Sequence, residues 1–567
     1  MNKRGRVFAF TLPLLLGMLL AACGSTTTAP AVTPPYKYTV PATHGGTVVY
    51  SDWQFPDSLN ILFAGSVVDI EVLDAIFGAP VAISSDGKFI PDQLLEVPTQ
   101  ANGDVSKDGL TLTMKLRHDL KWSDGQPLTA DDYVYFLNTL LDPATAPVST
   151  FGFEEISSIV ATDTYTVTLK YKEVFAPYLT FLPFALPKHL WGSIPNGDLA
   201  NTPDVNLAPK ISSGPYVLSD YAADQSFTMV PNKNYTSTSF HPAVLDKVIF
   251  KGYQSKDALI AGYQAGETDH AEDFTLADLQ KLNGLPGFHI SPNIAYEHLD
   301  FNLQNPVLQD GNVRKAIEEA IDRCQIIQSV LNQKCSDLGV DSILPAPSPE
   351  YDPSIKAFGF DLNQAKADMQ TAGWNCSSGT CKKADGTAFP TLNLVTTSGN
   401  QQRADVTQIV KQDLAALGIN INLDGQYYPA GTLFGDYGHG GILATGKYDL
   451  SLFAFTFGID SGSSLSTFQS SEIPSDAHPA GGNFERVNDP QVDQLLKEAN
   501  STLDIAKRHD LIIQLQKYLI EHVYVIPMYL RPNLTLTTPN IGNYFDNPTA
   551  AGNMWNVGDW YLVKKSS

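Results

Sequence analysis

The longest apolar stretch of this chain lies at its very beginning. Residues 7–22 are apolar with few interruptions, and three basic side chains precede them within residues 1–6. A basic segment followed by a short apolar core is typical of an export signal. The core is shorter and more interrupted than a membrane span, which needs about 20 apolar residues. The pattern therefore predicts that residues 1–22 are a signal peptide.

Strand and helix periodicities alternate along the rest of the chain. Residues 111–117 alternate apolar and polar side chains, which predicts a half-buried strand. Thr129 then predicts a helix N-cap, with Asp132 placed to complete a capping box. The pair Asp142-Pro143 marks the expected end of that helix.

Later segments repeat this alternation. Three further helices and two further strands are predicted: helices at 313–331, 406–417 and 511–519, and strands at 419–423 and 523–526. Gly418 is expected to cap the second of these helices. In the first, Glu319 and Arg323 stand four residues apart in the order that favours a surface ion pair. The alternation predicts a mixed α/β fold with several sheets.

Composition narrows the classes of function. The 567 residues carry a net charge of −23, which becomes −26 when residues 1–22 and their three basic side chains are removed. This length suggests about three or four domains. The acidic balance excludes a nucleic-acid partner, which requires a basic face, and disfavours docking on anionic lipid. No second apolar run reaches 18 residues, so no other membrane span is expected.

The apolar run ends at a cysteine. Leu20-Ala21-Ala22-Cys23 resembles a bacterial lipobox, and this resemblance implies that the Cys23 thiol is acylated and becomes the first residue. The alternative is an ordinary export signal in which Cys23 is incidental. Residues 23–43 are rich in Thr, Pro and Ala and are expected to form a flexible linker. The predicted location is the outer face of a membrane, with lipid at Cys23.

Four cysteines remain after Cys23. An even number in an exported chain predicts disulfides, with three possible connectivities. Cys376 and Cys381 flank turn-forming residues and are expected to pair, which leaves Cys324 with Cys335 as the second pair. A metal site is the alternative, but neither cluster has a C-x-x-C pair or a neighbouring histidine.

Sequence signatures of catalysis are absent. The chain contains no H-E-x-x-H, G-x-S-x-G or P-loop motif. Its isolated histidines and carboxylate pairs have ordinary structural explanations. We therefore expect no enzymatic activity, no cofactor and no metal. Aromatic residues make up 10% of the chain, which suits an apolar ligand pocket as well as a core.

Several segments together resemble one family, the extracytoplasmic solute-binding proteins of peptide-type ABC transporters (oligopeptide, dipeptide and nickel binders). These segments are DGLTLTMKLRHDLKWSDGQPLTADDYVYFLN (108–138), SSGPYVL (212–218) with PNKNY (231–235), HLDFNLQNPVLQDGNVRKAIEEAIDR (298–323), DLNQAKADMQTAGW (361–374), NDPQVDQLLKEAN and YVIPMYLRP. The similarity runs in order through nearly all of residues 45–567.

The resemblance implies two lobes joined by two crossovers, with the ligand in the cleft between them. Lobe one would comprise residues 44–297, with a subdomain at about 76–209, and residues 529–567 would complete it. Lobe two would comprise residues 298–528. Hinge closure around a small solute would follow. A peptide is the expected ligand, an ABC permease the expected partner, and a monomer the expected state.

The resemblance also places a ligand site. A lobe-two strand would pair with the peptide main chain through the segment Phe453, Phe455, Thr456 and Phe457. Relatives have an Asp near this strand for the ligand's ammonium group, and Asp460 is the acid nearby, two or three residues late. If Asp460 does not serve, the ligand is a blocked peptide or another apolar or sugar-like solute.

Aromatic positions of lobe one complete the expected site. The strand end Tyr50-Ser51-Asp52-Trp53 and the aromatic segment Phe151-Gly152-Phe153 match cleft-lining positions in relatives, although Trp53 and Phe151 suit a core equally well. The alternative functions are a surface glycoside hydrolase, a sensor or chaperone lipoprotein, or the same fold binding a sugar or a metal complex. A hydrolase would need two carboxyl groups about 5–10 Å apart in the cleft.

Overall fold

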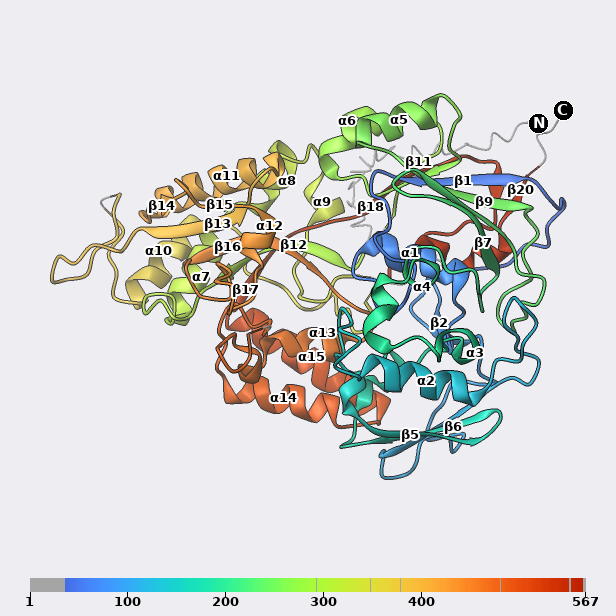
Figure 1. Cartoon of the computed structure of the whole chain (residues 1–567). Coiled ribbons are helices and arrows are strands. Elements are labelled where there is room, and N and C mark those ends of the chain that lie inside the picture. Colours follow the sequence, from blue (N-terminus) through green and yellow to red (C-terminus); the bar gives the residue numbers. More distant parts are fainter. Residues whose placement is uncertain are drawn as a thin grey trace, which may run out of the picture.

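The computed structural model describes residues 36–563, except residues 292, 347, 378, 480, 550 and 551. These residues form a two-lobed α/β molecule in which each lobe is built around its own mixed sheet (Figure 1). The predicted signal peptide 1–22 and Cys23 lie outside the described residues. In the part of the chain that is described, no helix is both long and apolar enough to cross a membrane.

Lobe one contains a seven-stranded sheet in the order β11-β18-β10-β1-β9-β8-β7. Its strands are β1 (Thr47–Asp52), β7 (Tyr216–Ala222), β8 (Ser226–Pro231), β9 (Lys247–Gly252), β10 (His270–Ala271), β11 (Phe288–Ser291) and β18 (Asn533–Thr537). The first strand, β1, is parallel to both β9 and β10, so its carboxyl end lies beside the carboxyl end of β10. Helix α1 (Val67–Ile76) follows β1 along the chain.

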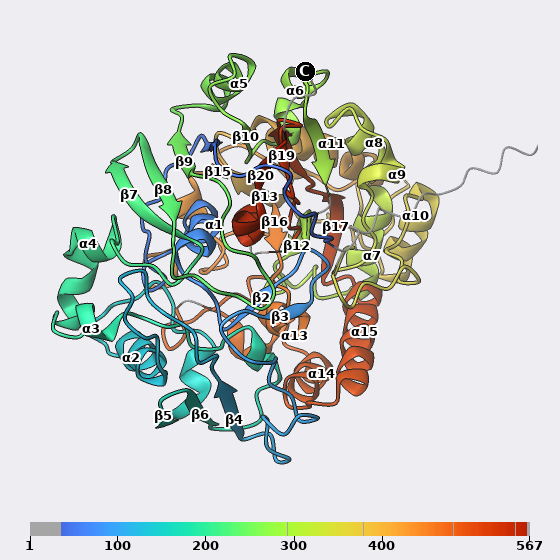
Figure 2. The same ribbon diagram turned by 90° about the vertical axis from the view of Figure 1, so that its right-hand side faces the viewer.

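A smaller antiparallel sheet with order β4-β6-β5 forms a subdomain of lobe one, seen with α2 at the lower edge of Figure 2. Its elements are β4 (Thr111–Lys115), α2 (Ala130–Leu140), β5 (Ile156–Asp163) and β6 (Thr166–Tyr171). The expected strand and helix are confirmed here, and Thr129 with Asp132 forms the expected capping box. A hairpin of β2 (Val81–Ile83) and β3 (Phe89–Pro91) lies between α1 and this sheet in sequence.

Lobe two contains a sheet with order β14-β13-β16-β12-β17, to which β15 adds beside β13. Its strands are β12 (Ala295–Phe301), β13 (Leu392–Thr397), β14 (Ile421–Asn422), β15 (Tyr427–Tyr428), β16 (Leu450–Thr456) and β17 (Val525–Leu530). Helices α7 (Gly311–Ala320), α10 (Leu362–Thr371) and α11 (Gln401–Leu417) pack in one core with one face of the sheet. Helices α13 (Ser461–Leu465), α14 (Pro490–Asn500) and α15 (Ile505–Glu521) lie on the opposite side (Figure 1).

Short elements fill the connections. They are α3 (Lys188–Trp191), α4 (Pro203–Asn206), α5 (Lys256–Gln264), α6 (Leu279–Leu282), α8 (Arg323–Ser329), α9 (Cys335–Leu338), α12 (Ala430–Leu433), β19 (Ile541–Gly542) and β20 (Tyr561–Leu562).

The chain passes between the lobes twice. It leaves the lobe-one sheet after β11 and enters the lobe-two sheet at β12, and it returns between β17 and β18. The predicted boundaries at 297–298 and 528–529 fall inside β12 and β17. Because β12 pairs with β17, the two crossovers lie side by side.

One predicted helix is wrong in its extent. The stripe at 313–331 forms two helices, α7 and α8, because Ile321 takes an extended conformation and Asp322 caps a new helix. This break removes the expected pairing of Glu319 with Arg323. Arg323 instead donates to the Val340, Phe358 and Pro527 carbonyls. The other expected helix end is confirmed, because Gly418 caps α11 with φ of 102°.

The four described cysteines form two disulfides. They join Cys324 to Cys335 and Cys376 to Cys381, which are the two pairs expected from the sequence. Each bridge closes a short loop, 11 and 5 residues apart respectively. Both lie in lobe two beside the core that contains α7, α10 and α11.

Candidate ligand-binding cleft

A cavity of about 360 Å³ lies where the two crossovers meet the lobes. Ile294, Ala295 and Arg531 of the crossovers line it, and Thr456 at the end of β16 faces it from lobe two. Lobe one contributes the end of β1, the first half of α1 and the segment after β10. The volume of the cavity is in the usual range for small-molecule sites, about 300–1,000 Å³.

Four carboxylates of lobe one surround this cavity: Asp52, Glu71, Glu272 and Asp273, here called the acidic cluster. Asp52 is 3% exposed and ends β1, whereas Glu272 and Asp273 follow β10 on the neighbouring strand. The parallel pairing of β1 and β10 therefore brings acids from distant parts of the sequence to one sheet edge. Glu71 joins them from α1.

Hydrogen bonds hold the inner part of the acidic cluster. The Tyr50 hydroxyl donates to Glu272 and lies 3.3 Å from a Glu71 oxygen. Asn553 Nδ2 donates to Glu272 at 2.6 Å, and His270 Nε2 lies 3.3 Å from the same carboxylate. The outer acid Asp273 accepts from the indole of Trp53 at 2.5 Å.

Burial and mutual repulsion give the four acids different pKa values. Burial, with the charges of Asp273 and Glu272, raises the pKa of Asp52 to about 8. Burial beside Glu272 also raises the pKa of Glu71 well above its usual value. Burial opposes ionisation of Glu272 as well, but hydrogen bonds from Glu71, His270 and Tyr50 outweigh it and lower that pKa to about 2. The cluster therefore stores protons that a bound cation can displace.

This electrostatic arrangement predicts a pH dependence. When folding raises the pKa of an acid, the native state is most stable at a pH below the acid's pKa in the unfolded chain. This stabilisation is lost as the pH rises toward the pKa in the folded protein. For Asp52 the window runs from the ordinary carboxyl pKa of 3.8 to the raised pKa of about 8. In this window the unfolding free energy of the ligand-free wild type should fall with rising pH. In Asp52→Asn this slope should be smaller by up to about 1.4 kcal/mol per pH unit. Denaturant melts at pH 5, 6.5 and 8 measure this, and parallel wild-type and variant profiles would contradict it.

The strand β16 presents an open edge to the cavity. Phe457 N donates to Ile294 O at 3.1 Å, so the odd-numbered residues at this end turn their main-chain groups toward β12. The even-numbered residues turn theirs the other way, and β13 pairs with β16 only at residues 450–452. The N–H and C=O groups of Ala454 and Thr456 are thus left on the open side of the strand.

The aromatic residues predicted around this strand lie on a different surface. Phe453 and Phe457 are buried, and Phe455 is half-buried and stacks on His298 with ring centroids 3.7 Å apart. These three rings pack inside lobe two and do not line the cavity. Thr456 is the member of the predicted segment that does.

The predicted aromatics of lobe one are also separated. Trp53 binds Asp273 at the rim of the acidic cluster, with Lys256 Nζ 5.2 Å from its ring centroid. Phe151 and Phe153 lie in the subdomain, where both pack edge-on against Phe181. Phe151 is 52% exposed. The structure brings only Trp53 close to the acidic cluster, and the ligand-binding roles of all three stay predictions.

Asp460 makes other contacts than the expected one. It caps α13 by accepting from Ser463 N, and Arg508 Nη1 and Nη2 donate to its two oxygens at 2.7 and 2.8 Å. Asp460 does not line the cavity. Its role as an ammonium anchor stays a prediction, and this geometry favours a structural role instead.

Asp460→Asn separates the two roles. We expect it to lower the unfolding free energy by about 2–4 kcal/mol, because Arg508 loses its charged partner. Peptide affinity of the folded variant should change by less than threefold. Chemical denaturation and calorimetry measure both quantities, and Arg508→Met should reproduce the stability loss. A large loss of affinity for free-amine peptides with little loss of stability would restore Asp460 as the anchor.

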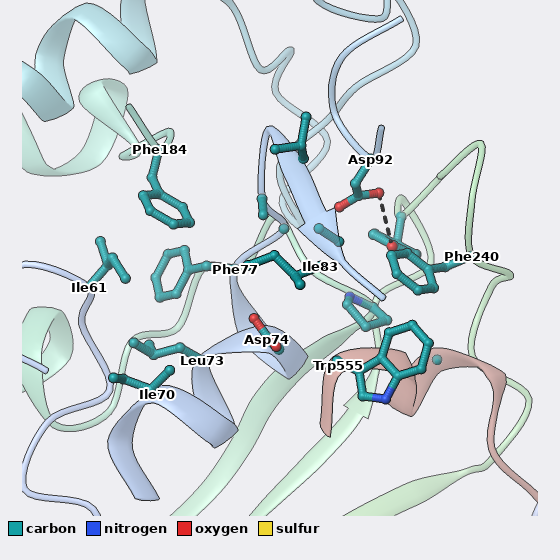
Figure 3. Close-up of a pocket in the computed structure, with 17 residues that line it drawn as sticks. Ile61, Ile70, Leu73, Asp74, Phe77, Ile83, Asp92, Phe184, Phe240 and Trp555 are labelled. Carbon is teal, nitrogen blue, oxygen red and sulfur yellow. Dashed lines mark hydrogen bonds between the residues drawn. The ribbon is translucent and has the colours of Figure 1, made fainter. Parts of the chain in front are cut away.

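A second cavity, of about 180 Å³, lies within lobe one (Figure 3). Its walls are mainly apolar and include Phe77, Phe240 and Trp555, with Asp74 pointing into the space. Burial, with the charge of Asp92, raises the pKa of Asp74 to about 8. Ile70 of α1 lines both cavities, so this pocket adjoins the cleft along one helix.

The acidic cluster is not among the sites predicted from the sequence. Asp52 lies in the strand end Tyr50-Ser51-Asp52-Trp53, where Trp53 is the residue predicted to contact the ligand. Glu272 and Asp273 follow a strand of two residues, which is too short to show a period. The only signal in the sequence is that an acidic pair and a strand-end acid occur without lysine or arginine within three residues.

Comparison with known proteins agrees with this architecture. The model of the bacterial extracellular solute-binding proteins, family 5 (middle part), matches residues 96–475. The oligopeptide-binding protein AppA of Bacillus subtilis is 26% identical over 589 residues, covering 99% of this chain and 100% of AppA.

Solved structures show the same two-lobed fold. The structure of AppA from Bacillus subtilis in complex with a nonapeptide superposes with a TM-score of 0.70 at 22% identity, covering 92% of this chain and 100% of AppA. The periplasmic EDTA-binding protein EppA gives a TM-score of 0.75 at 21% identity, covering 95% of this chain and 100% of EppA.

Proposed function

Because this chain belongs to the bacterial extracellular solute-binding proteins of family 5, we propose that it captures a peptide with a positively charged group in the cleft, for import by an ABC transporter. The observation that carries the proposal is the open edge of β16 beside a cavity lined by the acidic cluster. The role is one of binding, and no catalytic step is part of it.

The open edge supplies the main-chain recognition. An extended ligand can add to β16 by exchanging hydrogen bonds with the N–H and C=O groups of Ala454 and Thr456. Because these bonds do not depend on the ligand's side chains, such a site would accept peptides of different sequence. Thr456 lies at the cavity wall, so a strand added here runs past the acidic cluster.

The acidic cluster supplies the charge recognition. A buried ammonium group needs a carboxylate partner, since an unpaired buried charge costs several kcal/mol. Asp52 and Asp273 offer carboxylates at the cavity, and Arg531 lines the same cavity with the opposite charge. A zwitterionic ligand such as a peptide matches both signs, whereas a neutral sugar matches neither.

Calorimetry with paired ligands tests this proposal. Di- to pentapeptides with a free ammonium group or a lysine side chain should bind, and their acetylated counterparts should bind at least tenfold more weakly. Peptides N-methylated at alternate amides should lose affinity in the register that faces Ala454 and Thr456. Equal binding of acetylated and free peptides would refute the charge recognition. If the protein binds metal chelates but no peptide, its ligand would be a metal complex and the peptide proposal would be wrong.

Attachment at Cys23 belongs to the same proposal. A lipid on Cys23 would hold the binding protein beside its permease on the outer side of the membrane. The first described residues support a short connection to lobe one, because Tyr36 donates to Asp559 at 2.7 Å and Thr39 N donates to Asn543. We propose that the protein acts as a monomer in partnership with the permease.

A further inference from the structure

A second polar cluster lies inside lobe two, away from the cleft cavity. His298 and Asp300 project from the same face of β12, and Glu485 comes from the loop before α14. Their exposed fractions are 0%, 0% and 1%. Leu303 N donates to the Glu485 carbonyl at 3.0 Å, which holds this loop against the segment after β12.

Several polar atoms of this cluster have no hydrogen-bond partner among the described residues. They are both ring nitrogens of His298, Oδ1 of Asp300 and Oε2 of Glu485. His298 Nε2 lies 3.1 Å from Asp300 Oδ1, but without the alignment of a hydrogen bond. Unsatisfied buried polar groups are rare and costly in native proteins, so three of them facing one another indicate a missing partner.

A cation would satisfy all three side chains at once. Two buried carboxylates face each other here beside the unpartnered ring nitrogens of His298. Arg486 is close in sequence, but its two Nη atoms donate to the Phe484, Leu443 and Ala444 carbonyls. Arg403 pairs with Glu297, whose side chain projects from the other face of β12.

We propose that His298, Asp300 and Glu485 bind one divalent transition-metal ion of the Zn²⁺ class. One ligand atom from each residue lies within 4.8 Å of the other two, which is close enough for a single ion to join all three. The imidazole nitrogen favours Zn²⁺, Co²⁺ or Ni²⁺ over Ca²⁺ and Mg²⁺, which prefer oxygen ligands. A water can fill the fourth position; the Tyr296 hydroxyl, on the same face of β12, is also buried without a hydrogen-bond partner among the described residues.

The ion would have a structural role. It would join β12, which begins directly after the first crossover, to the loop that leads into α14. Phe455 of β16 stacks on the His298 ring, so the site supports the strand whose edge faces the cleft. Because the ligands are fully buried, we expect the metal to enter during folding and to exchange slowly.

Metal analysis of the full-length protein without a histidine tag tests the inference. After expression in zinc-supplemented medium, mass spectrometry should find about one metal ion per chain. Protein unfolded with a chelator and refolded should melt at a lower temperature without Zn²⁺ than with it. Refolding with Co²⁺ should give the visible absorption of a low-symmetry site.

Variants locate the ion. Glu485→Gln and His298→Gln should each lower the metal content at least tenfold, whereas His439→Gln, at an exposed His–Asp pair, should leave it unchanged. Wild-type protein that refolds fully and still holds less than 0.1 ion per chain would overturn the proposal. So would metal retained by folded Glu485→Gln and His298→Gln.

Discussion

Replacing Asp52 and Asp273 together by asparagine is expected to weaken the binding of a cationic peptide at least 100-fold at pH 8. Asp52 is 3% exposed and lines the cavity, so a ligand ammonium beside it is removed from water. Truncating one partner of a buried charge pair costs about 2–5 kcal/mol, and 100-fold corresponds to about 2.7 kcal/mol. Asparagine keeps the shape of each side chain and removes only its charge.

The fold should tolerate this change. Burial and neighbouring acids raise the pKa of Asp52 to about 8, so its charge opposes folding and its removal should stabilise the ligand-free protein. Gln54 N donates to Oδ1 of Asp52 at 2.9 Å, and the amide oxygen of asparagine can accept the same bond. A stable protein that has lost its ligand is therefore the expected outcome.

Calorimetry of the double variant and of Asp57→Asn provides the comparison. Asp57 is an exposed acid five residues after Asp52 and does not line the cavity, so its variant should bind within twofold of wild type. Affinity of the wild type should also rise between pH 5 and pH 8 as the ligand displaces the proton on Asp52, and the double variant should lose this slope. A double variant that binds like wild type would move the charge recognition out of the acidic cluster.

The sequence predicts local structure well where one period continues without interruption. The capping box at Thr129 and the Gly418 cap can be predicted because each depends on a few adjacent residues. The stripe from 313 to 331 is misleading, since the extended break at Ile321 keeps apolar residues on the inner side of both short helices. Hydrophobic periodicity alone does not distinguish a continuous helix from two helices that share a core.

The ligand site depends on contacts that no local pattern records. Asp460 was the nearest acid in sequence, but Arg508 lies 48 residues later and occupies both of its oxygens. Asp52 and Asp273 are more than 200 residues apart and meet because β1 and β10 pair in parallel. The resemblance to a family supplied the two-lobed fold, whereas the acids at the cavity follow from the pairing of strands in this particular chain.

Replacing Cys23 by alanine is expected to move the protein almost completely from the membrane fraction to the soluble fraction. Lipid on this cysteine, in the lipobox-like segment Leu20-Ala21-Ala22-Cys23, is the anchor that we propose. Tyr36 follows Cys23 by 13 positions, a distance over which extended chain spans at most about 45 Å, so lobe one would stay close to the membrane surface.

Fractionation of bacteria that express each form measures this effect. At least nine-tenths of the wild type should sediment with membranes and enter the detergent phase, and Cys23→Ala should do neither. Ser25→Ala, two residues away, is the matched control and should stay with the membrane. Purified Cys23→Ala should bind peptide with wild-type affinity, because the cleft lies in residues that the change does not touch. A Cys23→Ala protein that sediments like wild type would show that the anchor lies elsewhere, while leaving the assignment of the cleft intact.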